Sequence, residues 1–391
     1  MKPQTAERLD KLEQYYFAEK LAEIERRRKK GQPVINLAIG SPGSPPKQEI
    51  LQNLSNLVLE ENMHGYQSYR GNTDFREAWA NWYERHFGVT LDPDKEILAT
   101  MGSREAIMLI TMAFVNKGDK VLVPDPGYPI YSSATRLNEA EVVPYNLLPE
   151  NSWLPDFTEL EKLVDEKTKL IWINYPHMPT GKAATRELME KLSDFARQKN
   201  ILLVNDNPYS LLRNPTPVSL FTEGLTSEHL VELNSLSKSH NMAGWRVAGI
   251  SGNSEVIDSI LKVKSQFNAG IFLPIQKAAA SAISKDEEWI QSLNKEYRRK
   301  ERLGKELLDA LGCKYESDQS GMFLWATIPP EFSSSKKFVE YLLDIKDLFI
   351  APGFIFGKNG ERHIRLSLSN KEEELRKALF KIKVSLQKVE F

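Results

Sequence analysis

The feature that most constrains the fold of this chain is an alternation of helical patterns with short apolar runs between residues 73 and 265. Helical spacing of apolar residues occurs at 73–87, 103–115, 185–199 and 253–265. Strands that alternate with helices form a mostly parallel sheet with helices on both faces, so we expect an α/β fold. The predicted strands are Lys120–Val123, Glu141–Val143, Leu170–Ile173, Ile201–Val204, His229–Leu233 and Val247–Ser251.

The pattern differs at both ends of the chain. The first 30 residues show helical spacing, and a Gly- and Pro-rich stretch, Gly40–Pro46, follows as a predicted crossing loop. The C-terminal part predicts an α+β unit with a charged helix from about 285 to 311, strands near 321–327 and 361–367, and a last helix over 370–388. The expected domains are an N-terminal arm that forms part of a small domain (1–46), a large domain (47–284) and the C-terminal small domain (285–391).

Polar and reactive side chains follow the predicted strands, where ligands bind in open α/β sheets. A helix start made of small residues can hold a phosphate, a lysine can form a Schiff base, and a carboxylate can pair with a protonated ring nitrogen. Each feature alone also fits a cap, a turn or a surface lysine. Together they predict a pocket for pyridoxal phosphate. The segments are Thr100–Ser103, Asn174–Gly181, Asn205–Tyr209 and Asn234–Lys238.

The most specific motif is Ser235-Leu236-Ser237-Lys238, with Arg246 eight residues after the lysine. It resembles the lysine motif of class I and II aminotransferases of fold type I, and most closely the branch of aspartate, alanine and LL-diaminopimelate aminotransferases. The resemblance implies a seven-stranded sheet and ping-pong transfer of an amino group between an L-amino acid and a 2-oxo acid, with glutamate and 2-oxoglutarate as one pair. Other matching segments, in family order, are Asn36–Gly40, Gly102–Ala106, Pro124–Tyr131, Asn205–Tyr209, Asn241–Gly249 and Arg362–Ser367.

The resemblance also implies roles for single residues. Lys238 would hold the cofactor as a Schiff base and then move the proton between substrate and cofactor. Asp206 would keep the pyridine nitrogen protonated, Tyr209 would donate to the phenolate oxygen, and the ring of Tyr128 would stack on the pyridine. The further cofactor-binding residues are Gly102, Ser103, Arg104, Asn174, Ser235, Ser237, Arg246 and Tyr66.

Three further expectations concern substrate and assembly. Arg365 would bind the substrate α-carboxylate through its planar fork, near the backbone at Ile39 and Gly40. Tyr66 resembles a tyrosine that reaches the phosphate of a neighbouring subunit, which implies a homodimer. Arg104 lies where some aspartate-type relatives carry a basic residue, which predicts dicarboxylic substrates; the alternative is an ordinary residue of a first helical turn.

One position departs from the family pattern. Met178 stands where the family usually has the Asn of Asn-Pro-Thr-Gly, whose amide donates to the cofactor phenolate oxygen. A thioether cannot donate a hydrogen bond, so Tyr209 becomes the main expected donor. Asn174 and His177 are close in sequence, and the sequence alone does not place either at that oxygen. The substitution therefore bears on the electronic state of the cofactor more than on its binding.

Composition argues against several other classes. Lys and Arg number 52 against 53 Asp and Glu, so the chain lacks the basic excess of a nucleic-acid binder. It has no apolar run of about 18 residues, no apolar core of a signal peptide near its start, and one cysteine, Cys313. We therefore expect a cytoplasmic protein with small-molecule partners.

The sequence argues against a metal site and a dinucleotide site, and it leaves two alternative functions open. The six histidines show no paired ligand spacing, which argues against a metal site, and no Gly-x-Gly-x-x-Gly follows the early strands. A β-lyase or another pyridoxal phosphate enzyme on the same fold remains an alternative, because fold alone does not fix the reaction. The other alternative is a non-catalytic regulator that binds the cofactor.

Overall fold

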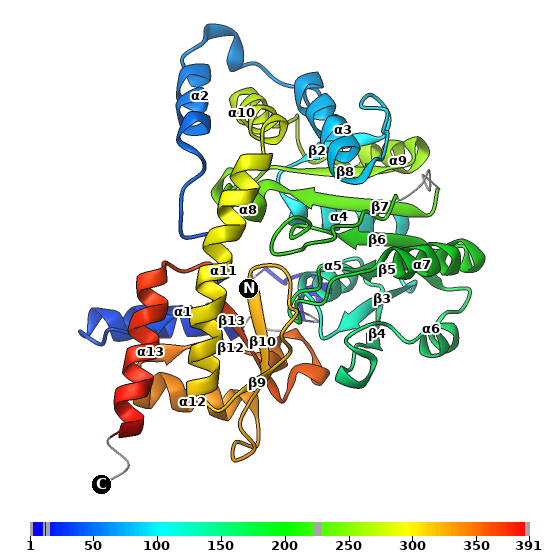
Figure 1. Ribbon diagram of the computed structural model, residues 1–391. Helices are drawn as coiled ribbons and strands as arrows, with labels where there is room; N and C mark the ends of the chain where they lie inside the picture. The colour runs from blue at the N-terminus through cyan, green and yellow to red at the C-terminus, as the bar shows by residue number, and fades with distance from the viewer. Residues whose placement is uncertain (1–2, 11, 13–15, 222–227, 388–391) are drawn as a thin grey trace.

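A seven-stranded sheet lies at the centre of the large part of the structure (Figure 1). The computed structural model describes residues 3–10, 12, 16–221 and 228–387. The strands are β2 (Ile97–Thr100), β3 (Lys120–Asp125), β4 (Glu141–Asn146), β5 (Thr168–Ile173), β6 (Leu202–Asp206), β7 (Leu230–Ser235) and β8 (Ala248–Gly252). Their order is β2-β8-β7-β6-β5-β3-β4, and β8 runs antiparallel to both neighbours while the other pairs are parallel.

This sheet confirms the predicted α/β fold and the seven strands that the family resemblance implies. The six strands predicted from apolar runs correspond to β3 through β8. β2 was not predicted, because it has only four residues and follows a helix without a clear alternation of its own.

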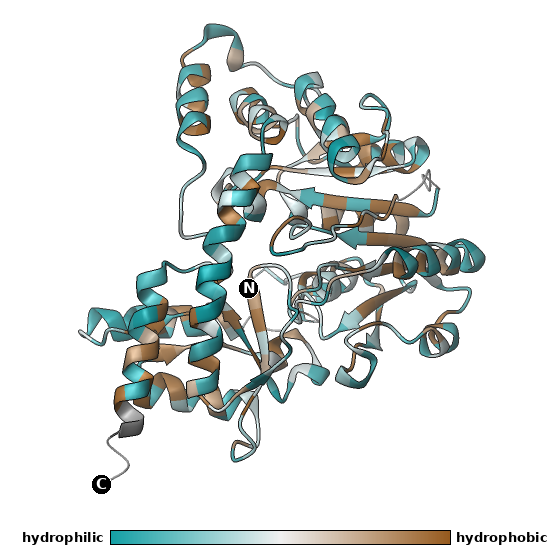
Figure 2. Cartoon of the chain, in the orientation of Figure 1, coloured by the Kyte–Doolittle hydropathy of each residue, from teal (hydrophilic) through white to brown (hydrophobic). Residues whose placement is uncertain are grey.

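Helices cover both faces of this sheet, and alternate residues of each strand contact opposite layers. Leu170 and Trp172 of β5 belong to the core formed with α4, α5 and α9, whereas Ile171 and Ile173 belong to the core formed with α3, α7 and α10. Figure 2 shows hydrophobic residues concentrated along these strands. The helices are α2 (Gln48–Val58), α3 (Thr73–Phe87), α4 (Ser103–Phe114), α5 (Ile130–Leu137), α6 (Phe157–Leu163), α7 (Arg186–Lys199), α8 (Leu236–Ser239), α9 (Ser254–Lys264) and α10 (Leu273–Ser284).

A second unit follows the long helix α11 (Glu287–Ala310), which confirms the predicted charged helix. Its antiparallel sheet has the order β12-β13-β10-β9 and packs with α11 and α12, while α13 packs against α11. The elements are β9 (Lys314–Tyr315), β10 (Phe323–Thr327), α12 (Ser335–Lys346), β11 (Leu348–Phe349), β12 (Ala351–Pro352), β13 (His363–Ser367) and α13 (Glu372–Gln387).

The N-terminal arm joins this second unit, because β1 (Ile35–Asn36) pairs in parallel with β11. The prediction of one helix over the first 30 residues is wrong at its start. A 3-10 turn lies at Glu7–Leu9, Leu12 is not helical, and the described part of α1 is Tyr16–Lys29; residues 1–2, 11 and 13–15 lie outside the described residues. The exact domain limits 1–46, 47–284 and 285–391 remain a prediction.

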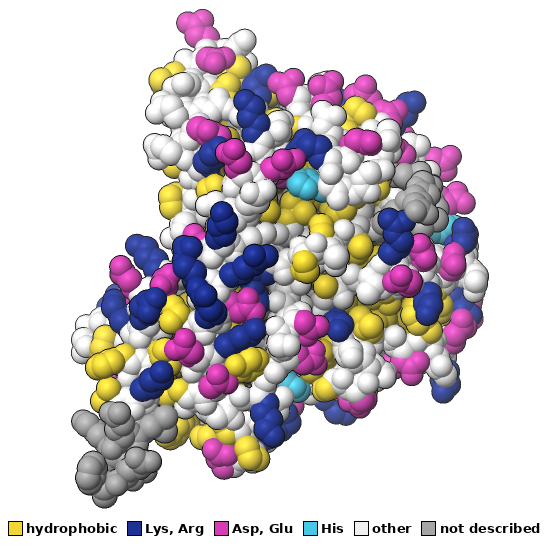
Figure 3. All heavy atoms as spheres, viewed as in Figure 1, with side chains coloured by type: hydrophobic (Ala, Val, Ile, Leu, Met, Phe, Trp, Pro, Cys, Tyr) yellow, Lys and Arg dark blue, Asp and Glu magenta, His cyan; other side chains and the backbone are white. Residues whose placement is uncertain are grey.

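The surface carries interspersed positive and negative side chains on the face that Figure 3 shows, which accords with a formal net charge of −1. Within the described part of the chain, no helix combines the length and the apolar character needed to cross a membrane.

Candidate active site

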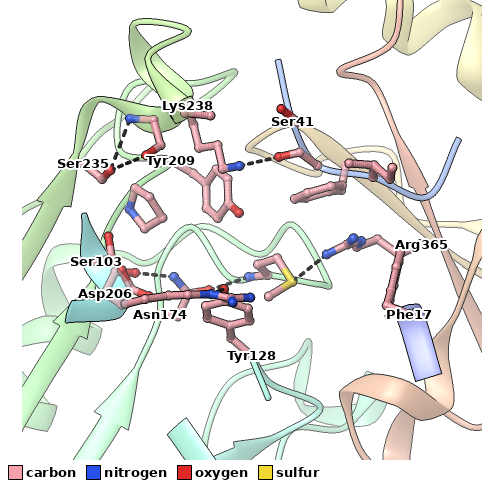
Figure 4. A pocket seen from close by; sticks show the side chains of 18 of the residues that line it. Phe17, Ser41, Ser103, Tyr128, Asn174, Asp206, Tyr209, Ser235, Lys238 and Arg365 are labelled. Carbon is pink, nitrogen blue, oxygen red and sulfur yellow. Dashed lines mark hydrogen bonds between the residues drawn. The ribbon is translucent and has the colours of Figure 1, made fainter. Parts of the chain in front are cut away.

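A cavity of about 600 Å³ lies beyond the carboxyl ends of β5, β6 and β7 and extends to β13 and α1 (Figure 4). It brings together most of the predicted site residues, which come from segments far apart in the sequence. Gly102 and Tyr66 do not line it. The predicted residues that do are Ile39, Gly40, Ser103, Arg104, Tyr128, Asn174, Asp206, Tyr209, Ser235, Ser237, Lys238, Arg246 and Arg365.

Lys238 enters the cavity from α8, directly after β7. The side chain of Ser235 caps this short helix by accepting a hydrogen bond from the backbone N–H of Ser237 at 3.2 Å. The Lys238 ammonium donates to the carbonyl oxygen of Gly40. Burial, together with the positive charges of Arg365 and Arg246, lowers the pKa of Lys238 to about 8. A larger share of this amine is therefore neutral near pH 8 than for an exposed lysine.

Asp206 lies at the end of β6 and is 3% exposed. Its Oδ2 accepts a hydrogen bond from the Tyr131 hydroxyl at 2.8 Å, whereas its Oδ1 is buried without a hydrogen-bond partner among the described residues. Burial raises the pKa of this carboxyl to about 6, and the bond from Tyr131 opposes that rise. A buried carboxylate oxygen without a hydrogen-bond donor destabilises the folded protein, so we expect a bound ligand to supply a cationic or N–H partner to this atom inside the cavity.

Small and basic residues meet at the start of α4. Gly102 precedes this helix with a φ of 82°, and a Cβ at Gly102 would lie 2.2 Å from Nη2 of Arg246. Gly102 therefore lets the Arg246 guanidinium approach the helix start, although it does not line the cavity itself. Ser103 and Ser235 lie on the same side, and Ser235 donates from its hydroxyl to Ser237 Oγ at 2.9 Å. Helix N–H groups, hydroxyls and a guanidinium together suit a phosphate.

Arg365 projects from β13 on the opposite side of the cavity, and it is 7% exposed (Figure 4). Its Nη2 donates to the Ala38 carbonyl at 2.9 Å, and its Nη1 lies 3.0 Å from the sulfur of Met178. The rings of Phe323 and Phe356 contact the guanidinium carbon at centroid distances of 3.9 and 4.6 Å. Such a guanidinium has a fixed plane, which favours bidentate binding of a carboxylate.

The two polar residues near Met178 differ in how they relate to the cavity. The Asn174 side chain donates to the Asp206 backbone carbonyl and accepts from the Met178 N–H at 2.8 Å. Nδ1 of His177 lies 2.8 Å from the Thr180 hydroxyl, whereas its Nε2 is buried without a hydrogen-bond partner among the described residues; His177 does not line the cavity. Asn174 thus reaches the cavity wall with both ends of its amide already bonded.

Positive charge dominates the cavity. Its lining contains the cations Arg104, Lys238, Arg246 and Arg365 against one carboxylate, that of Asp206. Arg104 donates through Nε to the Tyr128 hydroxyl at 2.9 Å. A cavity with this balance attracts anions such as a phosphate and carboxylates.

The comparison with known proteins agrees with this geometry. Residues 32–382 match the family model described as aminotransferase class I and II. The chain belongs to this family. An LL-diaminopimelate aminotransferase of Gloeobacter violaceus is 37% identical over 382 residues, which is 96% of each chain.

Two solved aminotransferase structures are also similar. The apo structure of BacF from Bacillus subtilis has a TM-score of 0.93 and 35% identity, covering 97% of this chain and 98% of that one. Thermus thermophilus aspartate aminotransferase with maleate has a TM-score of 0.90 and 26% identity, covering 97% and 99%. The chain is therefore a pyridoxal-phosphate-dependent aminotransferase that acts on small amino and 2-oxo acids.

The side chains of the cavity fit pyridoxal phosphate independently of the comparisons. The unpartnered Asp206 Oδ1 offers an acceptor to the pyridine N–H, while Arg246 and the start of α4 suit the phosphate. The comparisons favour transamination over the β-lyase and regulator alternatives.

Several residues of the site were not predicted from the sequence. Tyr131 ends the matching segment Pro124–Tyr131, and its position three residues after Tyr128 at a predicted helix start is a usable signal for a role in the site. Phe323 and Phe356 resemble ordinary core residues, and no sequence signal links them to Arg365. Phe17, on α1, also lines the cavity.

Proposed function

We propose that this aminotransferase binds pyridoxal phosphate through Lys238 and Asp206, with glutamate and 2-oxoglutarate as one amino pair. The observation that carries the assignment is the pair of groups in the cavity: a half-buried lysine with a lowered pKa, and a buried carboxylate with one oxygen that has no partner among the described residues. Structural ion pairs satisfy both partners, whereas these two groups both face a cavity.

When bound, the cofactor supplies an electron sink that accepts the electron pair released when the substrate Cα–H bond breaks. Asp206 holds the proton on the pyridine nitrogen, and Tyr131 fixes the carboxylate through its 2.8 Å bond. Lys238 removes the proton at the substrate Cα and returns it at the cofactor carbon, because its pKa of about 8 lets it act as base and acid near neutral pH.

The remaining cofactor contacts position the ring. Arg246, Ser103, Ser235 and Ser237 hold the phosphate. The Tyr209 phenol stays protonated, because burial raises its pKa, and it donates to the cofactor's ring oxygen.

Arg365 binds the α-carboxylate of either substrate. Its guanidinium is already oriented by the Ala38 carbonyl and by two aromatic rings, so little side-chain freedom is lost on binding. The Gly40 backbone lies between this clamp and Lys238. The α-carbon is thereby brought to the lysine.

Arg104 supports the choice of a dicarboxylic pair. It lines the cavity as an exposed cation, so a distal carboxylate of glutamate can reach it. The name of the Gloeobacter relative makes LL-diaminopimelate a second candidate donor.

A homodimer is part of the proposal. Tyr66 is 95% exposed and lies outside the cavity of its own chain, so its expected phosphate contact requires a neighbouring subunit. Leu59, Phe267 and Phe272 are also large, apolar and exposed, at 82%, 61% and 41%, which is typical of a covered interface. We also retain a cytoplasmic location as a proposal, in line with the single cysteine.

Borohydride reduction of the cofactor-loaded protein, followed by peptide mass spectrometry, tests the assignment of Lys238. We expect the label on Lys238 in the wild type and in the exposed-lysine control Lys295→Ala. A label on another lysine contradicts the proposal. Glutamate should then convert the bound cofactor to its amine form, and 2-oxoglutarate should convert it back.

A further inference from the structure

One wall of the cavity is apolar and comes from the N-terminal arm. Phe17, Ala18 and Leu21 of α1 line the cavity, together with Ile39. The spacing of the three helical positions places them on one face of α1. Leu21 and Ile39 are 36% and 38% exposed, although both are large hydrophobic residues. Exposed apolar side chains that face a binding cavity are a surface that a ligand covers.

The orientation of α1 is fixed by polar contacts on its other side. Lys20 pairs with Glu340 of α12 at 2.6 Å, and Arg27 pairs with Asp344 of the same helix at 2.6 Å. The Tyr16 hydroxyl donates to Glu340 at 3.1 Å. Because these contacts hold the polar face of α1 against α12, the apolar face is presented to the cavity.

The wall lies on the side of the carboxylate clamp. Figure 4 shows Phe17 beside Arg365, across the cavity from Asp206. The rings of Phe323 and Phe356, which contact the Arg365 guanidinium, extend the apolar surface on this side. A substrate whose α-carboxylate is bound by Arg365 therefore has apolar surface within reach of its side chain.

The charges of the cavity disfavour a second ammonium group on the substrate. The lining contains four cations, and its one carboxylate, Asp206, lies at the opposite side and already bonds Tyr131. A diamino acid would bring a distal ammonium into this cavity, whose apolar wall holds no carboxylate. Even where a distal carboxylate of the same substrate meets Arg104, as in LL-diaminopimelate, that ammonium has no carboxylate of the protein to pair with on this wall. The lining thus distinguishes apolar side chains from cationic ones.

We propose that the second amino pair of this enzyme is an L-amino acid with a large apolar side chain, aromatic or branched aliphatic, and its 2-oxo acid. Phe17, Leu21 and Ile39 determine this specificity by contacting the side chain. The inference rests on the proposed function and adds the second substrate to it. Arg104 serves the dicarboxylic pair and the α1 wall serves the apolar pair, so both substrates use one carboxylate clamp.

Single-turnover half-reactions test the proposal. Cofactor-loaded enzyme is mixed separately with L-phenylalanine, L-leucine, L-glutamate and LL-diaminopimelate, and conversion of the cofactor to its amine form is followed by absorbance. We expect phenylalanine or leucine to react at least about tenfold faster than LL-diaminopimelate, the scale of discrimination that an apolar pocket provides. A faster reaction with LL-diaminopimelate overturns the proposal.

The outcomes separate this inference from the proposed function. Reaction with glutamate and none with the apolar amino acids overturns the inference and leaves the proposed function standing. Reaction with the apolar amino acids and none with glutamate overturns the dicarboxylic pair and supports the inference. No reaction with any amino acid overturns both.

Variants of the wall provide the second test. Phe17→Ala and Ile39→Ala should lower kcat/KM about tenfold more for phenylalanine than for glutamate. Phe380→Ala is the matched control, because Phe380 is 70% exposed on α13 and does not line the cavity. Calorimetry with the unreactive ligands 3-phenylpropanoate and glutarate should show the same preference in Kd. An equal loss for both ligands in the wall variants overturns the proposal.

Discussion

Replacing Met178 by Asn should shift the titration of the bound cofactor. The cofactor's ring oxygen carries negative charge in the Lys238-linked form, and each hydrogen bond donated to it lowers the proton affinity of the linkage nitrogen. Met178 cannot donate, the side-chain amide of Asn174 is bonded to other residues, and His177 does not line the cavity. The donor that Asn introduces is therefore not a duplicate of one already supplied by these neighbours.

An Asn side chain at position 178 can keep the contact that Met178 makes with Arg365. The Oδ1 of Asn lies the same number of bonds from Cα as the Met178 sulfur, so it can accept from Arg365 Nη1, which now lies 3.0 Å from that sulfur. The Asn Nδ2 is then free to donate to the ring oxygen. A hydrogen bond to a charged group contributes about 1.5 kcal/mol or more, and 1.36 kcal/mol corresponds to one pKa unit. We expect the linkage pKa to fall by about one unit.

A spectrophotometric pH titration of the long-wavelength band measures this shift. Met178→Leu is the control, because it keeps an apolar side chain of similar size without a donor, and its midpoint should match the wild type. The reasoning is refuted if the Asn variant titrates at the wild-type midpoint or above it, or if the Leu variant shifts equally. Either result would mean that another group, such as an ordered water, already supplies the bond.

Four further predictions follow from the site. Lys238→Ala should abolish turnover while weak cofactor binding survives through Arg246 and the start of α4; wild-type turnover in this variant would disprove the role of Lys238. Arg104→Met should lower kcat/KM at least about tenfold more for glutamate than for alanine, and equal losses would favour a plain helix residue. Attachment of the cofactor to the apoprotein requires neutral Lys238, so its rate, followed by stopped-flow absorbance, should rise with pH and level off above about pH 8; a continued rise to pH 10 would contradict the lowered pKa. Sedimentation should show a dimer at assay concentrations, and an active monomer would remove the role of Tyr66.

The sequence predicted the large sheet well because most of its strands, though not the edge strand β4, are buried on both faces. Such strands form continuous apolar runs, as in Leu170–Ile173, and these runs can be recognised in the sequence without knowing which strands pair with each other. The start of α1 was predicted poorly, because the spacing of Leu9 and Leu12 imitates a helix, whereas only a 3-10 turn forms at Glu7–Leu9.

The site was predictable where chemistry needs particular residue types. Lys238, Asp206 and Arg246 carry groups that few structural roles require together. The aromatic rings at Phe323 and Phe356 and the wall at Phe17 escaped prediction for the opposite reason. Apolar residues are common everywhere in a folded chain, and only the tertiary structure shows which of them face a cavity.

The short segment Ala38–Gly40 fixes the distance between Arg365, which binds the substrate carboxylate, and Lys238, which transfers the proton. The Ala38 carbonyl accepts a hydrogen bond from the Arg365 guanidinium, and the Gly40 carbonyl accepts one from the Lys238 ammonium. A Cβ at Gly40 would lie 2.5 Å from the ring of Phe323, so the backbone of this segment has little room to move toward that ring. The distance from clamp to lysine is thus set independently of α1. Changes in α1 can therefore give the enzyme a new choice of amino acid while the spacing on which proton transfer depends stays the same.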